Sequence, residues 1–311
     1  MTIAGVKARI VALDAAARPW AERSRLRGWA YELLLFGLKQ AWACLYGGLM
    51  LVLLVGTFLL YPRDAPLARY DFLVLAAIAI QVALLWWRLE TWTEAAVIFV
   101  FHVVGTVMEI YKTAHGSWTY PEHSVLRIGG VPLFTGFMYG CVGSYIARAL
   151  RLLDIHFSRR VRPWALWLLA IGAYANFFAD NLGVDVRWLL LAASFVIFGR
   201  VSFWFRPDQR FRRMPIALGF ALVALFIWLA ENAGTFAHIW IYPIQEHGWR
   251  PVPPEKMISW YLLMLLSFVL VITVHRPPVS AARPVPVFAR RRPHDQAAPD
   301  GLGIPSRAEL I

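Results

Sequence analysis

Long apolar stretches separated by short polar segments make up most of the chain between residues 42 and 275. A transmembrane helix needs about 20 mostly apolar residues to cross the bilayer core. Eight stretches come close to that length, at residues 42–61, 72–89, 95–112, 131–153, 163–179, 188–205, 214–236 and 258–275. The pattern therefore predicts an all-α fold, a polytopic bundle of about eight transmembrane helices.

Composition excludes an ordinary soluble globule. Hydrophobic residues make up 59% of the chain and charged residues only 16%, where a soluble domain carries about 25% charged residues. The only two cysteines, Cys44 and Cys141, both lie in apolar stretches. We therefore expect neither a disulfide framework nor a cysteine-based metal site.

Polar segments flank the membrane region, which divides into a first half at 32–154 and a second half at 155–276. Residues 1–31 place apolar residues at helical spacing among basic ones and predict a basic amphipathic segment on the membrane surface (Ile3, Val6, Ile10, Leu13). They lack the cleavage pattern of a signal peptide. Residues 277–311 are rich in Pro, Arg and Ala, which predicts a disordered cytoplasmic tail.

Basic residues are distributed unevenly between the two sides of the predicted bundle. Of the 31 lysines and arginines, seven fall on one side and the other 24 on the opposite side (the seven are Arg63, Arg69, Lys112, Arg127, Arg187, Arg250 and Lys256). Since cytoplasmic loops carry the excess of basic residues, we expect both termini in the cytoplasm. Basic clusters spaced by apolar stretches indicate membrane topology, so no nucleic-acid partner is expected.

An internal repeat appears when the chain is compared with itself at an offset of 122 positions. The shared pattern is E-x3-T-x4-W-x-Y-P, formed by Glu109, Thr113, Trp118, Tyr120, Pro121 and by Glu231, Thr235, Trp240, Tyr242, Pro243. Val131-Pro132 and Val252-Pro253 follow at an offset of 121. The third and fourth predicted helices thus pair with the seventh and eighth, which predicts a parallel repeat about an axis along the membrane normal. Alternatively, Trp, Tyr and Pro are common at membrane interfaces and helix starts, so W-x-Y-P is also explained as a scaffold signal.

The glutamates of this repeat are the strongest candidates for a functional site. An ionised side chain at the centre of a membrane helix costs about 2.5–3.5 kcal/mol, so such residues usually face the bundle interior or a wet cavity. We expect both to meet at one cavity that opens outward. The predicted catalytic residues are Glu109, Glu231 and Asp180, and the predicted substrate-binding residues are His102, Trp118, Tyr120, Asn176, Asn232, Trp240 and Tyr242. Taken singly, an intramembrane His or Asn is also explained as a hydrogen bond between helices.

The chemistry that these residues support is that of carboxylic acids. No histidine spacing matches a known metal motif, and Gly129-Gly130 lacks the remainder of a phosphate-binding loop, so neither a metal nor a cofactor is expected. Desolvation in an apolar pocket favours the protonated form of a carboxylic acid. Such an acid suits general acid catalysis on an apolar substrate, and equally suits proton coupling in a carrier.

The stretch from Val104 to Gly140 carries a family resemblance. Its segments E-I-Y-K-T-A-H-G-S-W-T-Y-P and G-G-V-P-L-F, with the later E-N-A-G-T-F-A-H-I-W-I-Y-P, resemble domain of unknown function 817, an uncharacterised family of bacterial integral membrane proteins. The resemblance extends over all eight predicted helices. It implies the inner (cytoplasmic) membrane of a bacterium as the location, and it implies no activity.

A more distant similarity is to membrane carotenoid hydratases and heterodimeric lycopene cyclases. Those enzymes are thought to protonate a polyene with a carboxylic acid, which implies roles here for Glu109, Glu231 and Glu255. The cyclase motif Pro-x-Glu-Glu is degraded in this chain, since one copy reads Pro132-Leu133-Phe134 and the other reads P-P-E-K from residue 253.

Three functions are compatible with the sequence. The first is a membrane-embedded enzyme that acts on an isoprenoid or other lipid, with Glu109 or Glu231 as the proton donor. The second is a proton-coupled small-solute carrier, which ranks lower because neither half shows the broken short helices of transporter sites. The third is a non-catalytic membrane scaffold. Lipid and the bilayer are the expected partners, and the sequence does not determine the substrate or the oligomeric state.

Overall fold

The structure is a computed structural model that describes residues 3–284, with side chains from residue 12 onward. Its α-helices are α1 (Ile3–Glu22), α2 (Arg25–Ala43), α3 (Leu45–Leu60), α4 (Arg69–Trp86), α5 (Trp92–Ala114), α6 (Phe134–Leu152), α7 (Pro163–Ala179), α8 (Arg187–Phe198), α9 (Ile216–Phe236) and α10 (Lys256–His275). The strands are β1 (Arg127–Ile128), β2 (Val131–Pro132), β3 (His156–Phe157), β4 (Ser202–Phe205) and β5 (Arg212–Pro215). Short 3-10 helices occupy Asp180–Leu182 and Pro243–Gln245.

Each of the eight predicted stretches overlaps one of the helices α3 to α10, and the protein is a mostly helical multi-pass membrane protein. Within residues 3–284, however, only α4, α5, α9 and α10 are long and apolar enough to cross a membrane alone. A fifth span results if α2 and α3, bent by 69° at Cys44, count as one. Arginines interrupt the end of α6, and α7 and α8 have only 17 and 12 residues. The prediction of eight transmembrane helices is thus not confirmed.

Two predicted boundaries are wrong at the end of the bundle where β3, β4 and β5 form a small sheet. The predicted helix 188–205 ends at Phe198, and its last residues form β4, which pairs antiparallel with both β3 and β5. After α10, Phe157 donates its N–H to the Pro278 carbonyl and accepts from the Ser280 N–H. The predicted tail therefore begins later than residue 277, and residues 285–311 lie outside the described part of the chain.

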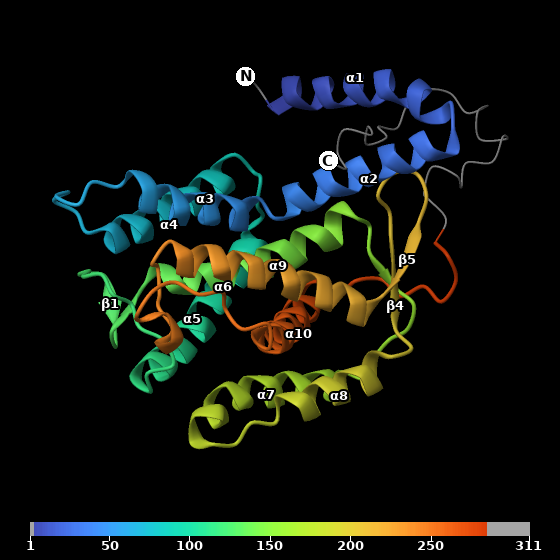
Figure 1. The fold of residues 1–311 in the computed structure, drawn as a ribbon. Coiled ribbons are helices and arrows are strands. Elements are labelled where there is room, and N and C mark those ends of the chain that lie inside the picture. Colours follow the sequence, from blue (N-terminus) through green and yellow to red (C-terminus); the bar gives the residue numbers. More distant parts are fainter. Residues whose placement is uncertain (1–2, 285–311) are drawn as a thin grey trace.

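The N-terminal segment forms a helical hairpin that runs past its predicted end at residue 31. Ser24 caps α2 by accepting the Arg27 N–H, which separates α2 from α1. The hairpin lies against the loop between β4 and β5, where Arg18 forms an ion pair with Asp208 at 3.0 Å and Lys39 donates to the Arg206 carbonyl at 3.1 Å (Figure 1). The side chains of residues 3–11, which include much of the predicted amphipathic face, lie outside the described residues.

Helix α10 is the most buried of the four long apolar helices. Figure 1 shows it between α6 and α9 on one side and the α7–α8 hairpin on the other. Helices α5 and α6 pack closely through glycines of α6. A Cβ atom added at Gly140 would lie 2.7 Å from the Ile98 side chain, and one at Gly143 would lie 2.7 Å from the Phe101 ring. Small residues at these positions let the two backbones approach.

The helices run back and forth between two ends of the bundle. One end, which we call the aromatic end because it carries both W-x-Y-P loops, contains residues 61–68, 115–133, 180–186 and 237–255 (Figure 1). The opposite end, which we call the hairpin end because the α1–α2 hairpin lies against it, contains residues 87–91, 153–162, 199–215 and 276–284. At the aromatic end, Gly129 and Gly130 both have positive φ and form the two-residue turn between β1 and β2. This is the backbone that a tight hairpin requires.

Candidate functional site

Glu109 lies near the end of α5 and is only 3% exposed. Three aromatic side chains donate hydrogen bonds to its carboxylate: the Trp118 indole at 2.8 Å, the Tyr120 hydroxyl at 2.6 Å and the Tyr139 hydroxyl at 2.6 Å. Trp118 and Tyr120 return to the helix because the chain reverses after α5 at Gly116, which has a φ of +69°. This glutamate is therefore fully enclosed by hydrogen-bond donors.

Tyr139 reaches Glu109 from the neighbouring helix α6 because Gly105 on α5 lacks a side chain. A Cβ atom at Gly105 would lie 2.5 Å from the Tyr139 ring. This glycine thus makes room for the third donor of the carboxylate.

Glu231 lies in the corresponding part of α9 and is also 3% exposed. The Tyr242 hydroxyl donates to its carboxylate at 2.5 Å and the Trp260 indole donates at 2.6 Å. Trp240 does not take the role that Trp118 has, and its ring instead covers Gly234, where an added Cβ would lie 2.5 Å from it. A hydroxyl and an indole thus hold each glutamate, but the indole comes from a different part of the chain in each case.

The two loops that follow α5 and α9 share backbone features at positions 122 apart. Gly116 and His238 both have positive φ, at +69° and +52°. Thr119 and Ile241 pair antiparallel, and each donates its N–H to the other's carbonyl at 2.9 Å. The loops that carry the W-x-Y-P pattern therefore contact each other directly.

This contact places the two carboxylate centres side by side. The Trp118 ring, which belongs to the Glu109 centre, packs edge-on against the Tyr242 ring of the Glu231 centre, with centroids 5.9 Å apart. The ammonium group of Lys256 lies over both rings, 5.8 Å from that of Trp118 and 4.8 Å from that of Tyr242. These aromatic faces attract positive charge.

The loop tyrosines are held in their hydroxyl form. Burial, and next the negative charge of Glu109, raise the pKa of Tyr120 well above its usual value. Burial and the charge of Glu231 do the same to the pKa of Tyr242. Both phenols therefore remain available as hydrogen-bond donors throughout the physiological pH range.

Three other predicted residues, Asn232, Asp180 and Asn176, form their hydrogen bonds and ion pairs away from the two glutamates. Asn232, next to Glu231 in sequence, is turned by about 100° around the helix and accepts the Val252 N–H at 2.9 Å. Asp180 forms ion pairs with Lys112 at 3.2 Å and Arg187 at 3.1 Å.

Asn176 closes the loop at the end of α7. Its side chain accepts the Val186 N–H at 2.8 Å. It and Asp180 therefore stabilise the connection from α7 to α8 rather than the acid centres.

The remaining candidates also lie apart from the carboxylates. The His102 ring packs at a tilt of 51° against Phe137 of α6, with ring centroids 4.5 Å apart, and its Nδ1 atom has no partner among the described residues. Glu255 is exposed at the start of α10. Residues 3–284 contain no group of three or more His, Cys, Asp or Glu placed to hold a metal ion.

The expected cavity opening outward from the acids is not what the structure describes. The space beside Tyr139 is a void of about 10 Å³ with an apolar lining that includes Phe101, Met108 and Leu266. A larger cavity lies at the hairpin end. Both glutamates are only 3% exposed, so in this conformation neither acid opens to solvent.

Sequence reasoning missed three buried acids, and one of them, Glu94, caps the start of α5 and pairs with Arg151 at 3.2 Å. Asp71 on α4 is 3% exposed and accepts the backbone N–H groups of Val125 and Leu126 at 2.9 and 2.7 Å, which fixes the loop before β1. Glu90 forms an ion pair with Arg148 at 2.8 Å, and both side chains are inaccessible to solvent. The sequence did contain a signal for the pair of Glu90 and Arg148, because an arginine inside the predicted span 131–153 requires a buried partner.

Fold and site together define a multi-pass helical membrane protein with two buried, aromatic-capped glutamates. Residues 32–268 match the model of a family described as protein of unknown function (DUF817), and the chain belongs to that family. It is 36% identical over 240 residues to the uncharacterized protein YoaT of Bacillus subtilis (strain 168), a match that covers 77% of this chain and 90% of that protein. The family predicted from the sequence is thereby confirmed.

Two solved structures are similar to part of the chain. A cross-linked trimer of MvINS matches 61% of this chain and 97% of its own, with 16% identity and a TM-score of 0.43. The mycobacterial Insig homolog MvINS from Mycobacterium vanbaalenii matches 58% of this chain and 93% of its own, with 15% identity and a TM-score of 0.42. Nothing about function follows from likeness at this level, and the similarity to carotenoid-modifying enzymes stays a prediction.

Proposed function

We propose that this protein is a membrane-embedded enzyme that acts on an isoprenoid or other lipid by proton transfer, with Glu109 and Glu231 as the proton-exchanging groups. The observation that carries the proposal is the matched pair of centres. Each glutamate is buried and is held by one hydroxyl and one indole at least. The packing of helices does not by itself require two buried acids, so we assign both of them a role in proton transfer.

The donors around each acid suit a group that gains and loses a proton. An indole N–H only donates, so Trp118 and Trp260 each fix an acceptor oxygen of their glutamate. A tyrosine hydroxyl both donates and accepts. When a glutamate takes up a proton, its tyrosine can turn to accept a hydrogen bond from it, so the acid keeps a partner in either state.

The surroundings of the acids favour an apolar substrate over a polar solute. The void beside Tyr139 is lined by apolar side chains and lies next to the Glu109 centre. The aromatic faces of Trp118 and Tyr242, over which Lys256 now lies, are suited to stabilise positive charge on a protonated polyene. A substrate enters this region only if the side chains that close it move apart.

We also infer that α5–α6 and α9–α10 are parallel duplicates and that the hairpin end is cytoplasmic. The matching φ values at Gly116 and His238 support the duplication, and the excess of arginines at the hairpin end supports the orientation. In a cysteine-free variant, His247→Cys should react with an impermeant thiol reagent added to intact cells, and Arg210→Cys only after the cells are opened. The reverse pattern would refute the orientation.

The proposed function is tested with Glu109→Gln and Glu231→Gln, which keep the shape of the side chain but remove its exchangeable proton. The matched control is Glu246→Gln, at an exposed glutamate of the same end. Lipid extracts of cells that express each variant, and of the purified proteins, are compared by mass spectrometry. We expect a lipid product with the wild type and the control, and its precursor with the two site variants.

Two other outcomes would contradict the proposal that this protein is an enzyme. If the lipids are identical but proton-driven uptake into proteoliposomes is lost in Glu231→Gln, the protein is a carrier. If both glutamine variants leave lipids and uptake unchanged, the acids are structural and the scaffold is the better interpretation.

A further inference from the structure

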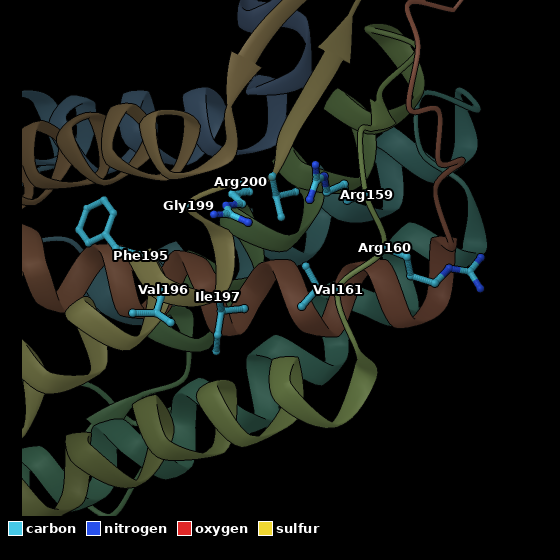
Figure 2. A pocket seen from close by; sticks show the side chains of 9 residues that line it. Arg159, Arg160, Val161, Phe195, Val196, Ile197, Gly199 and Arg200 are labelled. Carbon is cyan, nitrogen blue, oxygen red and sulfur yellow. The ribbon is translucent and has the colours of Figure 1, made fainter.

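A groove of about 570 Å³ lies at the hairpin end, between the loop before α7 and the end of α8. Three arginines line it, Arg159, Arg160 and Arg200, together with apolar residues of α8 and its continuation. Figure 2 shows Arg159 and Arg200 on the same side of the groove and Arg160 extending away from them. The groove lies at the opposite end of the bundle from both acid centres and has no role in the proposed reaction.

The arginines of this groove lack acidic partners. No Asp or Glu lines the groove, and none of the three arginines forms an ion pair within residues 3–284. Some other arginines at this end are paired, such as Arg206 with Asp154 at 3.1 Å. The groove is therefore a concentration of uncompensated positive charge, and it is complementary to an anion.

The apolar part of the groove lies where lipid is expected. Helix α8 has 12 residues, which at 1.5 Å per residue is about 18 Å, well short of the roughly 30 Å hydrocarbon core. Phe195 and Val196 in its last turn are 51% and 85% exposed. A short helix whose last turn exposes apolar side chains beside unpaired arginines presents surfaces for both acyl chains and a charged headgroup.

We propose that this groove binds an anionic glycerophospholipid. Its phosphate contacts Arg159 and Arg200, since the guanidinium fork matches phosphate oxygens, and its acyl chains lie along Phe195 and Val196. Basic pockets between transmembrane helices on the cytoplasmic side are suited to anionic headgroups. The bound lipid fills the space that the short helix α8 leaves at this face.

Native mass spectrometry of the full-length protein in detergent tests the site, with dioleoyl phosphatidylglycerol and dioleoyl phosphatidylcholine as probes. Each basic residue near an anionic surface contributes about a fivefold preference, so Arg159→Gln with Arg200→Gln should lower the preference for phosphatidylglycerol by roughly twenty-five-fold. The control is Arg210→Gln with Arg283→Gln, which removes two exposed arginines outside the groove. We expect that control to stay within about twofold of the wild type.

Two further measurements complete the test. Arg159→Lys with Arg200→Lys keeps the charge but not the guanidinium fork, so its preference should lie between those of the wild type and the glutamine variant. Inorganic phosphate at 100-fold excess should leave the bound lipid in place. Unchanged preference in the glutamine variant, or displacement of the lipid by free phosphate, would overturn the proposal, and neither result bears on the two glutamates.

Discussion

The ion pair between Arg148 and Glu90 allows a quantitative test of how this fold is held together. The Glu90 carboxylate accepts hydrogen bonds from Arg148 at 2.8 Å, Ser144 at 2.7 Å and Gln81 at 2.6 Å. Arg148 also donates to the Trp42 carbonyl at 3.3 Å. The network therefore joins α2, α4 and α6 to the segment just before α5.

Arg148→Met removes the only cation of this network and leaves a buried carboxylate with two neutral donors. Removing one partner of a buried ion pair costs about 3–5 kcal/mol, because the other charge stays buried without compensation. Replacing both partners, as Arg148→Met with Glu90→Leu, removes that penalty. It also takes the acceptor from Ser144 and Gln81, at about 1 kcal/mol for each of these two hydrogen bonds, while the bond to the Trp42 carbonyl is lost in both variants. We therefore expect the double variant to be more stable than Arg148→Met alone by about 1–3 kcal/mol.

The free energy of unfolding is measured in mixed micelles, by tryptophan fluorescence against the mole fraction of dodecyl sulfate. Arg151→Met is the matched control, since Arg151 pairs with Glu94 at 3.2 Å but its side chain is 51% exposed. Water screens the arginine end of this pair, and the buried Glu94 keeps the Thr91 N–H as a donor at 2.8 Å, so we expect Arg151→Met to cost less than Arg148→Met. The reasoning is refuted if Arg148→Met costs no more than Arg151→Met, or if adding Glu90→Leu makes the protein less stable still.

Two further predictions concern packing and loop anchoring. Gly140→Ala should destabilise the protein by about 1–3 kcal/mol in the same unfolding assay, because its Cβ would lie 2.7 Å from Ile98. Gly56→Ala, with nothing within 4 Å, should be neutral or stabilising, and equal costs at both positions would contradict close packing of α5 on α6. Asp71→Ala leaves two backbone N–H groups without an acceptor, at about 1–3 kcal/mol each if they stay buried, and should speed amide hydrogen exchange at residues 125 and 126. The exposed Asp64→Ala should not change exchange there, and unaltered protection in Asp71→Ala would show that the loop is held by other contacts.

The pattern of apolar residues determined the class of this protein and the position of its main helices. Every apolar stretch from residue 42 to 275 contains a helix, because helical hydrogen bonding is the means by which a single apolar segment satisfies its backbone in a bilayer. The number of membrane spans was not determined in this way. Within residues 3–284, the arginines of α6 and the short lengths of α7 and α8 leave four helices that are long and apolar enough to cross a membrane alone, or five spans with the bent α2–α3 pair.

The sequence also identified Glu109 and Glu231, and with them Trp118, Tyr120 and Tyr242, since these residues share a spacing in both copies of one pattern. It could not identify Tyr139 or Trp260, which lie 30 and 29 residues from their glutamates on other helices. Contacts between helices depend on how the helices are rotated and packed, and one sequence contains no direct record of that.

Tertiary structure alone decided which polar residues meet. Asn232 adjoins Glu231 in sequence but faces elsewhere, because successive residues of a helix are turned by about 100°. Asp180 and Asn176 close the end of α7, and Glu90 meets Arg148 across 58 residues. The unpaired arginines beside α8 come together only where a loop and a short helix end side by side. The sequence determined that this protein lies in a membrane and keeps acids there, because both are properties of single segments, while the partners of those acids depend on the packing of several helices.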